Sequence, residues 1–379
     1  MSRLCFVAAS EMTLKAFLRE HIRAASRRYE VLAVANCTQA RALRDIGVPV
    51  DVTPVGIERR IAPLADLVAL WRLWRLFRRA APDLIHSVTP KAGLLAMLAA
   101  RAARVPVRIH TFTGQVWATR RGLARAALKG FDRLIAACAT HVLADSASQR
   151  EFLLAEGVVR AERIAVLAQG SISGVDGERF RPDPAARETV RAQAGIPPEA
   201  VLFLYLGRLT RDKGLLDLAR AFGSVQDGWL MLVGPDEEGL AGEIRDACGG
   251  SAARLRFAPY TDRPEVFMAA ADVFVLPSYR EGFGSAVIES AAAGIPAIGT
   301  RIYGVTDAIV DGVTGFLVPP RDPAALAARM RQLASDAQLR LRLGAAARAR
   351  ALRDFSMAEV TRATLAYYAE RLKEAGLDA

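Results

Sequence analysis

The feature that most constrains this chain is a repeated alternation of short apolar runs with longer helical stretches. Runs such as VLFLYL (201–206) and VFVL (273–276) are each followed by a loop and then by a helical stretch. This rhythm predicts parallel strands covered by helices on both faces, because neighbouring parallel strands need a crossover connection. We therefore expect an α/β fold built on parallel sheets.

A glycine- and proline-rich stretch, GSISGVDGERFRPDP (170–184), interrupts this alternation near the middle of the chain. Since 379 residues exceed one ordinary domain, we place a domain boundary near residues 175–192. The same rhythm on both sides predicts two Rossmann-like domains, over residues 1–180 and 190–355. The last segment, 356–379, opens with the helix-capping pattern Ser-Met-Ala-Glu and is expected to be helical.

The first loop argues against a dinucleotide cofactor. A dinucleotide-binding domain carries G-x-G-x-x-G directly after its first strand. The first predicted strand here is LCFVAA (4–9), and no glycine occurs between residues 1 and 46. We therefore expect neither NAD nor FAD.

Positive charge is concentrated in the first half of the chain. The net charge is +11, but residues 1–150 hold 24 Lys and Arg against 10 Asp and Glu. A basic half of this kind indicates an anionic partner: nucleic acid, an anionic membrane surface or a phosphorylated acceptor. Nucleic-acid binding is the remote alternative, because most aromatic residues fall in apolar strands or helix faces and do not alternate with basic ones.

The cysteines and the N-terminus indicate a cytoplasmic protein. Four scattered cysteines without a C-x-x-C pair argue against a zinc site or a disulfide framework. The opening MSRLCFVAAS lacks the layout of a signal peptide, and no stretch of about 20 apolar residues predicts a membrane-spanning helix.

The stretch 270–300 holds the strongest candidate site. It reads as strand, loop, helix, turn and strand, with the helix beginning near Ser285. Glu289 falls in the second turn of a helix that has no other charged residue, so its carboxylate needs a partner or a ligand. Glu281 ends the preceding loop, and Gly-Phe-Gly-Ser between the two acids leads its N–H groups into a helix N-terminus, which favours anions.

Two further sets of residues point to polar chemistry. Arg208 and Lys213 lie five residues apart in the loop after the strand 201–206, a spacing that suits a diphosphate. His86 and His110 each end a short predicted strand, DLIH and VRIH. Because the carboxyl ends of parallel strands line the ligand crevice, we expect both histidines to be functional.

A strongly amphipathic helix is predicted over residues 64–80, LADLVALWRLWRLFRRA. Its apolar face is expected to contain Leu67, Leu70, Trp71, Trp74 and Phe77, and its arginines to lie on another face. One interpretation buries Trp71, Trp74 and Phe77 against the first sheet. The other places the helix on a membrane surface, with Trp and Arg at the level of the headgroups.

These motifs resemble one known family. EGFGSAVIE (281–289), GRLTRDKG (207–214), HSVTPKAG, HTFTGQVWAT and GSISGVD resemble the retaining GT-B glycosyltransferases of family GT4, in particular bacterial enzymes that extend lipid-linked saccharides. The resemblance implies two Rossmann-like domains with parallel sheets facing a central cleft. The first would be the acceptor side and the second the nucleotide-sugar side, with the final helix crossing back to the first domain.

The resemblance also implies roles for individual residues. Glu289 would bind the ribose hydroxyls, and Glu281 with the backbone of Gly282, Phe283, Gly284 and Ser285 would hold the donor sugar and distal phosphate. Arg208 and Lys213 would neutralise the leaving diphosphate. His110 would lie beside the transferred sugar, and His86 nearer the acceptor. Together, the catalytic set would be His110, Glu281, Arg208 and Lys213.

The expected function is therefore a retaining hexosyltransferase that uses a nucleotide sugar, with a UDP-sugar such as a UDP-N-acetylhexosamine as the favoured donor. The acceptor would be a saccharide or a polyprenyl-diphosphate-linked saccharide of bacterial surface polysaccharide synthesis. No D-x-D triplet is present, so neither a metal nor a cofactor is expected. The enzyme would work peripherally on the inner face of the cytoplasmic membrane.

Two other enzyme classes use similar residues. A GT-B epimerase would convert a nucleotide sugar without an acceptor. A glycoside hydrolase would use two carboxylates as acid and nucleophile, but the cations and the anion-binding loop here fit a phosphate leaving group better.

Overall fold

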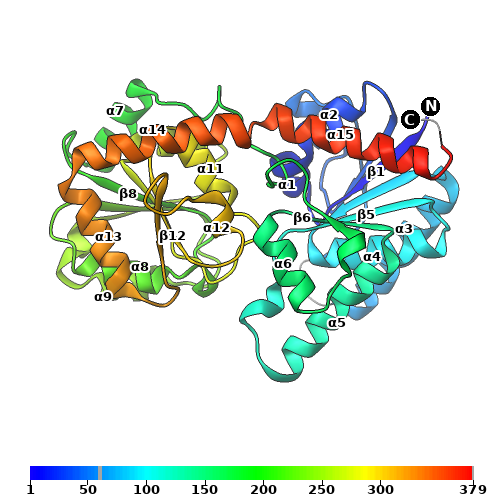
Figure 1. Ribbon diagram of the computed structural model, residues 1–379, viewed down its shortest axis with the longest axis horizontal. Helices are drawn as coiled ribbons and strands as arrows, with labels where there is room; N and C mark the ends of the chain where they lie inside the picture. Colours follow the sequence, from blue (N-terminus) through cyan, green and yellow to red (C-terminus); the bar gives the residue numbers. More distant parts are fainter. Residues whose placement is uncertain (59–61, 378–379) are drawn as a thin grey trace. The chain divides into compact units, whose positions relative to one another are not determined.

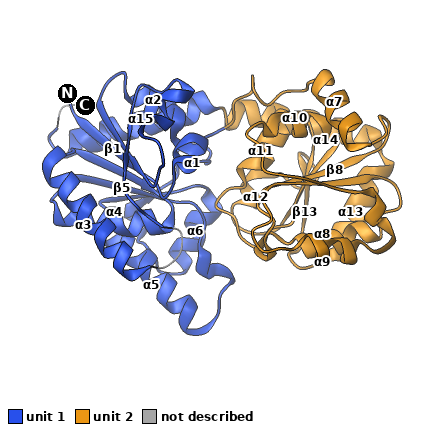
Figure 2. Cartoon of the chain, turned by 180° about the vertical axis from the view of Figure 1, so that it is seen from behind, with its two compact units in different colours: residues 1–174, 357–379 blue, residues 175–356 orange. Residues whose placement is uncertain are grey.

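The computed structural model describes residues 1–58 and 62–377 of the chain. It forms two compact units, which Figure 2 distinguishes by colour. Unit 1 contains Met1–Gly174 together with the segment that begins at Met357, and unit 2 contains Val175–Ser356. The division falls inside the glycine- and proline-rich stretch, and the C-terminal segment belongs to the first unit.

Unit 1 is built on a seven-stranded parallel sheet in the order β3-β2-β1-β4-β5-β6-β7. Its strands are β1 (Arg3–Val7), β2 (Glu30–Ala35), β3 (Val52–Pro54), β4 (Leu84–Val88), β5 (Val107–Phe112), β6 (His141–Ala144) and β7 (Ile164–Ala165). The order reverses between β1 and β4, so this sheet has the switch point at which open α/β sheets bind ligands.

Helices cover both faces of this sheet (Figure 1). They are α1 (Glu11–Thr13), which continues through a π-turn at Leu14–Leu18 into α2 (Arg19–Ala25), then α3 (Pro63–Ala80), α4 (Pro90–Ala102), α5 (Gly122–Cys138), α6 (Ala147–Ala155) and α15 (Met357–Glu374). Strand β1 shows how one strand serves two cores. Cys5 and Val7 join the core beneath α3, α4 and α5, whereas Leu4 and Phe6 join the core beneath α2 and α15.

The C-terminal helix α15 completes the second of these cores. Tyr368 and Leu372 of α15 are fully buried there, and the helix lies alongside α2. Of the helices in the described part of the chain, none has both the length and the hydropathy needed to cross a membrane.

Unit 2 is built on a six-stranded parallel sheet in the order β10-β9-β8-β11-β12-β13, with its own continuous core. Its strands are β8 (Leu202–Leu206), β9 (Trp229–Val233), β10 (Leu255–Ala258), β11 (Val273–Leu276), β12 (Ala297–Thr300) and β13 (Gly315–Val318). The helices are α7 (Pro184–Ala194), α8 (Leu215–Gly223), α9 (Ala241–Cys248), α10 (Pro264–Ala270), α11 (Ser285–Ala292), α12 (Val305–Ala308), α13 (Pro323–Ser335) and α14 (Ala337–Asp354). The switch point of this sheet lies between β8 and β11.

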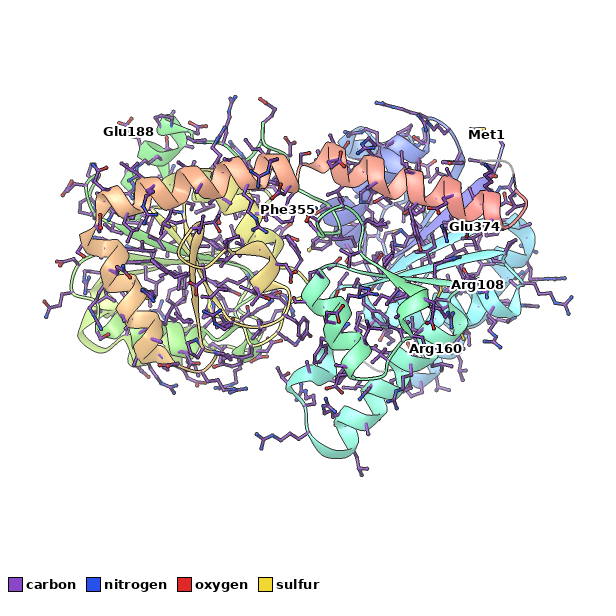
Figure 3. All side chains as sticks on the ribbon, viewed as in Figure 1. Met1, Arg108, Arg160, Glu188, Phe355 and Glu374 are labelled. Atoms are coloured by element: carbon purple, nitrogen blue, oxygen red, sulfur yellow. The ribbon has the colours of Figure 1, made fainter. Side chains whose placement is uncertain are left out.

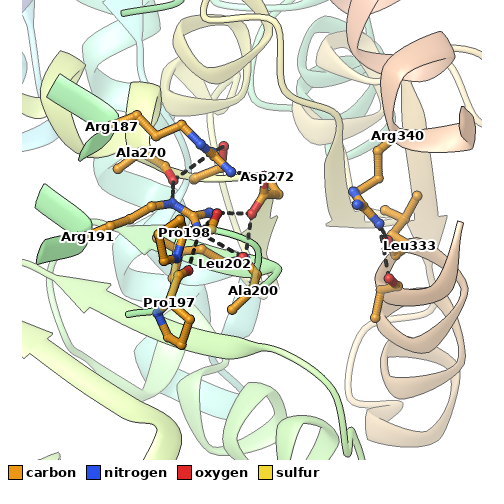
Figure 4. A network of polar contacts seen from close by, with 12 residues as sticks. Arg187, Arg191, Pro197, Pro198, Ala200, Leu202, Ala270, Asp272, Leu333 and Arg340 are labelled. Atoms are coloured by element: carbon orange, nitrogen blue, oxygen red, sulfur yellow. Dashed lines mark hydrogen bonds and ion pairs between the residues drawn. The ribbon is translucent and has the colours of Figure 1, made fainter. Parts of the chain in front are cut away.

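A partly buried ion cluster fixes the amino ends of β8 and β11 (Figure 4). Both carboxylate oxygens of Asp272 are occupied. Oδ1 accepts from Arg187 at 2.8 Å, while Oδ2 accepts from Arg191 at 2.5 Å and from the backbone N–H of Leu202 at 2.7 Å. Because the two arginines come from α7, the cluster also ties this helix to the sheet. The opposite, carboxyl ends of the same two strands carry the candidate site.

Candidate functional site

The two loops singled out by the sequence meet at the switch point of unit 2. The loop after β8 carries Lys213, and the loop after β11 carries Glu281. Lys213 Nζ donates to Glu281 Oε1 at 2.6 Å, and the two side chains are only 18% and 15% exposed. The predicted cation and the first predicted carboxylate are thus in direct contact, 68 residues apart in sequence.

Glycines allow these loops to approach so closely. Gly214 has φ of +71°, and a Cβ at this position would lie 2.0 Å from the carbonyl oxygen of Pro277 in the neighbouring loop. Gly304, after β12, has φ of +84°, and its Cβ would lie 2.5 Å from the carbonyl oxygen of Gly282. Any side chain would push these backbones apart, so both positions require glycine.

Arg208 lies in the same loop as Lys213 but has a different partner. Its guanidinium donates to Glu237 at 2.9 Å, and both side chains are more than one third exposed. The acidic stretch 235–238 contributes contacts to both the β8 loop and helix α9. Asp236 accepts the backbone N–H groups of Leu240 and Ala241 at the start of α9, and Glu237 neutralises Arg208.

The Gly-Phe-Gly-Ser stretch leads into α11, which begins at Ser285 as predicted. Gly284 adopts a left-handed conformation, with φ of +85°, immediately before the helix. The ring of Phe283 is buried and packs edge-to-face against Phe355, 5.1 Å between centroids; Figure 3 labels Phe355 at the end of α14. Phe283 can therefore contribute only its backbone to a ligand.

The sequence predicts that the carboxylate of Glu289 needs a partner or a ligand. Among the described residues, no hydrogen bond or ion pair reaches this side chain. Arg179, the cation that opposes the rise in the pKa of Glu289, is itself engaged with Glu265 at 2.9 Å and with the carbonyl oxygen of Asp262 at 2.7 Å. Burial raises the pKa of Glu289 to about 7, with Glu265 adding to the rise and Arg179 opposing it. A ligand that donates hydrogen bonds would satisfy this group.

Sequence reasoning missed two charged residues of this site, Asp212 and Arg280. Asp212 Oδ2 and the Arg280 guanidinium lie 2.7 Å apart, directly beside the Lys213–Glu281 contact. The signal was present in the sequence: an Asp-Lys pair in one loop and an Arg-Glu pair in the other, with their charges in opposite order.

In unit 1, the structure corrects the expected position of the two histidines. Strands β4 and β5 continue for two residues beyond His86 and His110, so neither histidine ends its strand. The residues that follow each histidine are apolar, β-branched or small and extend the ladder, in which Ser87 pairs with His110 and Val88 with Thr111.

His110 is completely buried. Its Nδ1 lies 2.8 Å from Ser87 Oγ, whereas its Nε2 has no hydrogen-bond partner within the described part of the chain. Gly93 of α4 makes room for the ring, because a Cβ there would lie 2.2 Å from the ring carbon Cε1. Burial lowers the pKa of His110 to about 3, so the ring is neutral. Its predicted contact with a sugar stays a prediction.

His86 has partners at both ring nitrogens. Nδ1 contacts the hydroxyl of Tyr368 from α15, and Nε2 lies 2.7 Å from Thr111 Oγ1. Burial, followed by the nearby His21 and His110, lowers the pKa of His86 to about 3. This arrangement gives His86 a packing role between the sheet and α15, and its acceptor role stays a prediction.

The structure also corrects the predicted apolar face of helix α3. The residues that pack into the core are Ala69, Leu73 and Phe77. Trp71 and Trp74 are 51% and 39% exposed, so the interpretation that buries both tryptophans is wrong. The exposed apolar side chains of this helix, hereafter the α3 strip, are Leu64, Leu67, Val68, Trp71 and Trp74. Exposed arginines adjoin the strip at positions 72, 75, 78 and 79.

The two units, each an open parallel sheet covered by helices on both faces, are those of the GT-B fold of glycosyltransferases. Residues 17–170 match the family described as "Glycosyl transferase 4-like domain", and residues 186–350 match "Glycosyl transferases group 1". The chain belongs to this family of glycosyltransferases.

Two named relatives are similar to this chain over most of its length. The chain is 30% identical over 325 residues to the capsular polysaccharide biosynthesis glycosyltransferase CapM of Staphylococcus aureus, covering 84% of this chain and 85% of CapM. It is 27% identical over 273 residues to an Escherichia coli UDP-Gal:alpha-D-GlcNAc-diphosphoundecaprenol alpha-1,3-galactosyltransferase, covering 70% of this chain and 69% of that enzyme.

Among solved structures, the Anabaena protein Alr3699/HepE in complex with UDP and glucose has a TM-score of 0.81. It is 20% identical and covers 98% of this chain and 100% of its own. At this identity the likeness concerns the fold alone, and it supports the GT-B assignment.

Proposed function

We propose that this glycosyltransferase transfers a sugar from a UDP-sugar to a saccharide acceptor carried on a polyprenyl diphosphate, with retention of configuration. The observation that carries the proposal is the Lys213–Glu281 contact at the switch point of unit 2. The names of CapM and of the E. coli enzyme favour polysaccharide or lipid-linked glycan synthesis, and favour transfer over epimerisation. Retention rests on the resemblance of the EGFGSAVIE stretch to retaining enzymes.

In this proposal the site residues divide the work of binding and leaving-group stabilisation. Glu289 accepts the ribose hydroxyls, which would satisfy its unpaired carboxylate. Lys213 and Arg208 neutralise the UDP diphosphate, on which negative charge grows as the glycosidic bond breaks. Glu281 and the backbone of 282–285 bind the donor sugar and the distal phosphate, and His110 hydrogen-bonds the sugar through Nε2.

Metal independence is part of the proposal. Lys213 supplies a positive charge, and its hydrogen bond to Glu281 already holds that charge at the loop expected to bind phosphate. A cation fixed by the protein can take the part that Mg²⁺ plays for other diphosphate leaving groups.

A thermal-shift panel of UDP-, GDP- and ADP-sugars tests the donor. A ligand at about 100 times its dissociation constant adds about 2.7 kcal/mol to the free energy of unfolding. UDP-sugars are expected to raise the melting temperature, and GDP- and ADP-sugars to raise it less. A panel without any response would contradict the nucleotide-sugar site.

The acceptor is tested by incubating the protein with a radiolabelled UDP-sugar and bacterial membranes. Transfer predicts label in the lipid fraction that grows with added membranes. Label that stays in the nucleotide pool as a converted sugar would identify an epimerase instead.

We further propose peripheral binding to anionic membranes through α3. The α3 strip presents aromatic and aliphatic side chains, and Arg75 stacks over Trp71 at 5.3 Å from the ring centroid. Such a combination suits the headgroup region, where each basic residue near an anionic surface adds about 1 kcal/mol of attraction.

Liposome sedimentation tests this second part. Arg72→Glu with Arg75→Glu should release the protein from anionic vesicles at low salt without lowering its melting temperature. The matched control reverses two exposed arginines of unit 2, Arg331→Glu with Arg342→Glu, and should leave binding unchanged. Failure of the wild type to bind anionic vesicles would favour a soluble acceptor.

A further inference from the structure

The two loops at the switch point of unit 2 are joined by two adjacent ion pairs. Lys213 and Glu281 form one, at 2.6 Å, and Asp212 and Arg280 form the other, at 2.7 Å. Each loop supplies one acid and one base from consecutive positions. The first pair belongs to the proposed donor site, whereas the second has no role in it.

We propose that Asp212 and Arg280 are positioning residues, whose ion pair holds the β8 loop in register with the β11 loop and so places Lys213 and Glu281 for the donor diphosphate. This inference rests on the proposed function. It assigns neither residue a contact with the substrate.

The contacts between the β8 loop and the β11 loop, hereafter the joint, centre on Asp212. Its Oδ1 accepts from the Thr210 hydroxyl at 2.6 Å, and its Oδ2 accepts from Arg280. Its backbone carbonyl accepts the N–H of Tyr279 at 2.9 Å. One residue of the β8 loop therefore contacts two consecutive residues of the β11 loop, through both its side chain and its backbone.

Tyr279 extends the joint to helix α8. Its hydroxyl donates to Asp217 Oδ2 at 2.5 Å, and its ring is covered by the guanidinium of Arg321 at 4.0 Å from the centroid. The β11 loop is thereby attached to the β8 loop and also to the helix that follows it. Such redundancy restricts the movement of Lys213 relative to Glu281.

The order of the charges makes the register specific. In the observed register each acid faces a base. A slip of one residue would place Asp212 against Glu281 or Lys213 against Arg280, and like charges at this distance repel. The second ion pair thus penalises the alternative alignments that the first pair alone would tolerate.

Asp212 keeps its charge although it is half-buried. Burial by itself would raise its pKa, but the Thr210 hydroxyl and the cations Arg280, Lys213 and Arg208 together lower the pKa below its ordinary value. The joint therefore persists through the neutral range.

The substitution Asp212→Asn distinguishes a positioning role of this residue from a purely electrostatic role. Asp212→Asn makes the site more positive, so a purely electrostatic role predicts tighter binding of pyrophosphate and unchanged or faster turnover. A positioning role predicts slower turnover, because a displacement of about 1 Å in a catalytic group can lower the rate about 100-fold.

The experiment compares Asp212→Asn, Arg280→Gln and the double variant with the wild type. Turnover is followed as UDP released from the UDP-sugar that stabilises the wild type most, and binding by calorimetry with inorganic pyrophosphate. Each single variant should lower kcat at least about tenfold and change pyrophosphate affinity less than about threefold. The double variant should be no slower than the slower single variant, because both remove the same contact.

Controls keep the result interpretable. Arg211→Gln removes a neighbouring cation of the same loop, whose ion pair with Glu243 is more than half exposed, and should leave kcat unchanged. Arg280→Lys retains the charge and should restore most of the turnover, which separates the ion pair from a folding defect. Melting temperatures should stay within a few degrees of the wild type.

The contrary outcomes are distinct. Wild-type kcat in Asp212→Asn or Arg280→Gln, or additive losses in the double variant, would overturn the positioning role. A large loss of pyrophosphate affinity in Arg280→Gln alone would overturn it too, because Arg280 would then bind phosphate directly. Full activity in Lys213→Ala would instead overturn the proposed donor site itself.

Discussion

The unpaired carboxylate of Glu289 predicts that donor binding depends on pH. Burial raises its pKa to about 7 from an ordinary value of 4.5, so near neutrality the carboxyl is about half protonated in the free protein. The ribose hydroxyls donate hydrogen bonds, and only the ionised form accepts at both oxygens. UDP-glucose binding should therefore release a proton below about pH 7.

The size of the effect follows from the pKa. If only the ionised form binds, the dissociation constant rises by a factor of one plus ten to the power of 7 minus pH. This factor is about 2 at pH 7, about 11 at pH 6 and about 100 at pH 5, since each pKa unit is worth about 1.4 kcal/mol. UDP-glucose is the suitable probe, because its diphosphate is a diester without a proton that titrates in this range.

The contribution of Glu289 to the free energy of unfolding depends on pH in the opposite sense. A carboxyl with a raised pKa holds its proton more tightly in the folded than in the unfolded chain. The free energy of unfolding is therefore highest below pH 4.5 as far as this group is concerned, and falls as pH rises towards 7. The shift of about 2.5 pKa units corresponds to about 3 kcal/mol.

Calorimetry with UDP-glucose between pH 5.5 and 8.5, in two buffers of different ionisation enthalpy, measures both affinity and proton release. Glu289→Gln should bind more weakly at pH 8, and both the pH dependence and the proton release should disappear. Glu243→Gln, an exposed carboxylate of α9, is the control and should behave as the wild type. A wild-type affinity that is flat across this range, or an equal slope in Glu289→Gln, would refute the reasoning.

The remaining predictions concern the leaving group and the sugar. Lys213→Ala and Arg208→Ala should each lower kcat by orders of magnitude and leave the melting temperature unchanged. Lys213→Ala should lower kcat more, because Arg208 is the more exposed of the two cations. Turnover should persist in excess EDTA, and loss restored by Mg²⁺ or Mn²⁺ would contradict the proposed mechanism. His110→Ala should lower kcat more than it raises KM for the donor, and an unaffected kcat would remove this histidine from the reaction.

The fold was accessible from the sequence because its determinants are local. Buried runs of four to six residues, the glycines and prolines that end them and the β-α alternation predict parallel sheets without any knowledge of long-range contacts. The start of α11 at Ser285 follows from such local signals. The observed ends of β4 and β5 do not follow from local signals, because the ladder extends past the histidines through pairing with neighbouring strands.

The site was only partly accessible for the same reason. Lys213 and Glu281 stand out by residue type and by the motifs around them, but their direct contact depends on the strand order. The face of α3 that packs inward was mispredicted, because periodicity shows that a helix is amphipathic but not how much of its apolar surface the sheet covers. Ala69 and Leu73 pack inward, and two tryptophans stay in solvent.

The return of α15 to unit 1 has a consequence for how the protein is made. Residues 1–174 leave the ribosome without Tyr368 and Leu372, which belong to one of the two cores of their unit. All of unit 2, residues 175–356, is synthesised in between, which takes about 10 to 40 s at 5 to 20 residues per second. Unit 2 is continuous in sequence and can close its core during translation, whereas unit 1 must wait with an open apolar face until the last helix emerges.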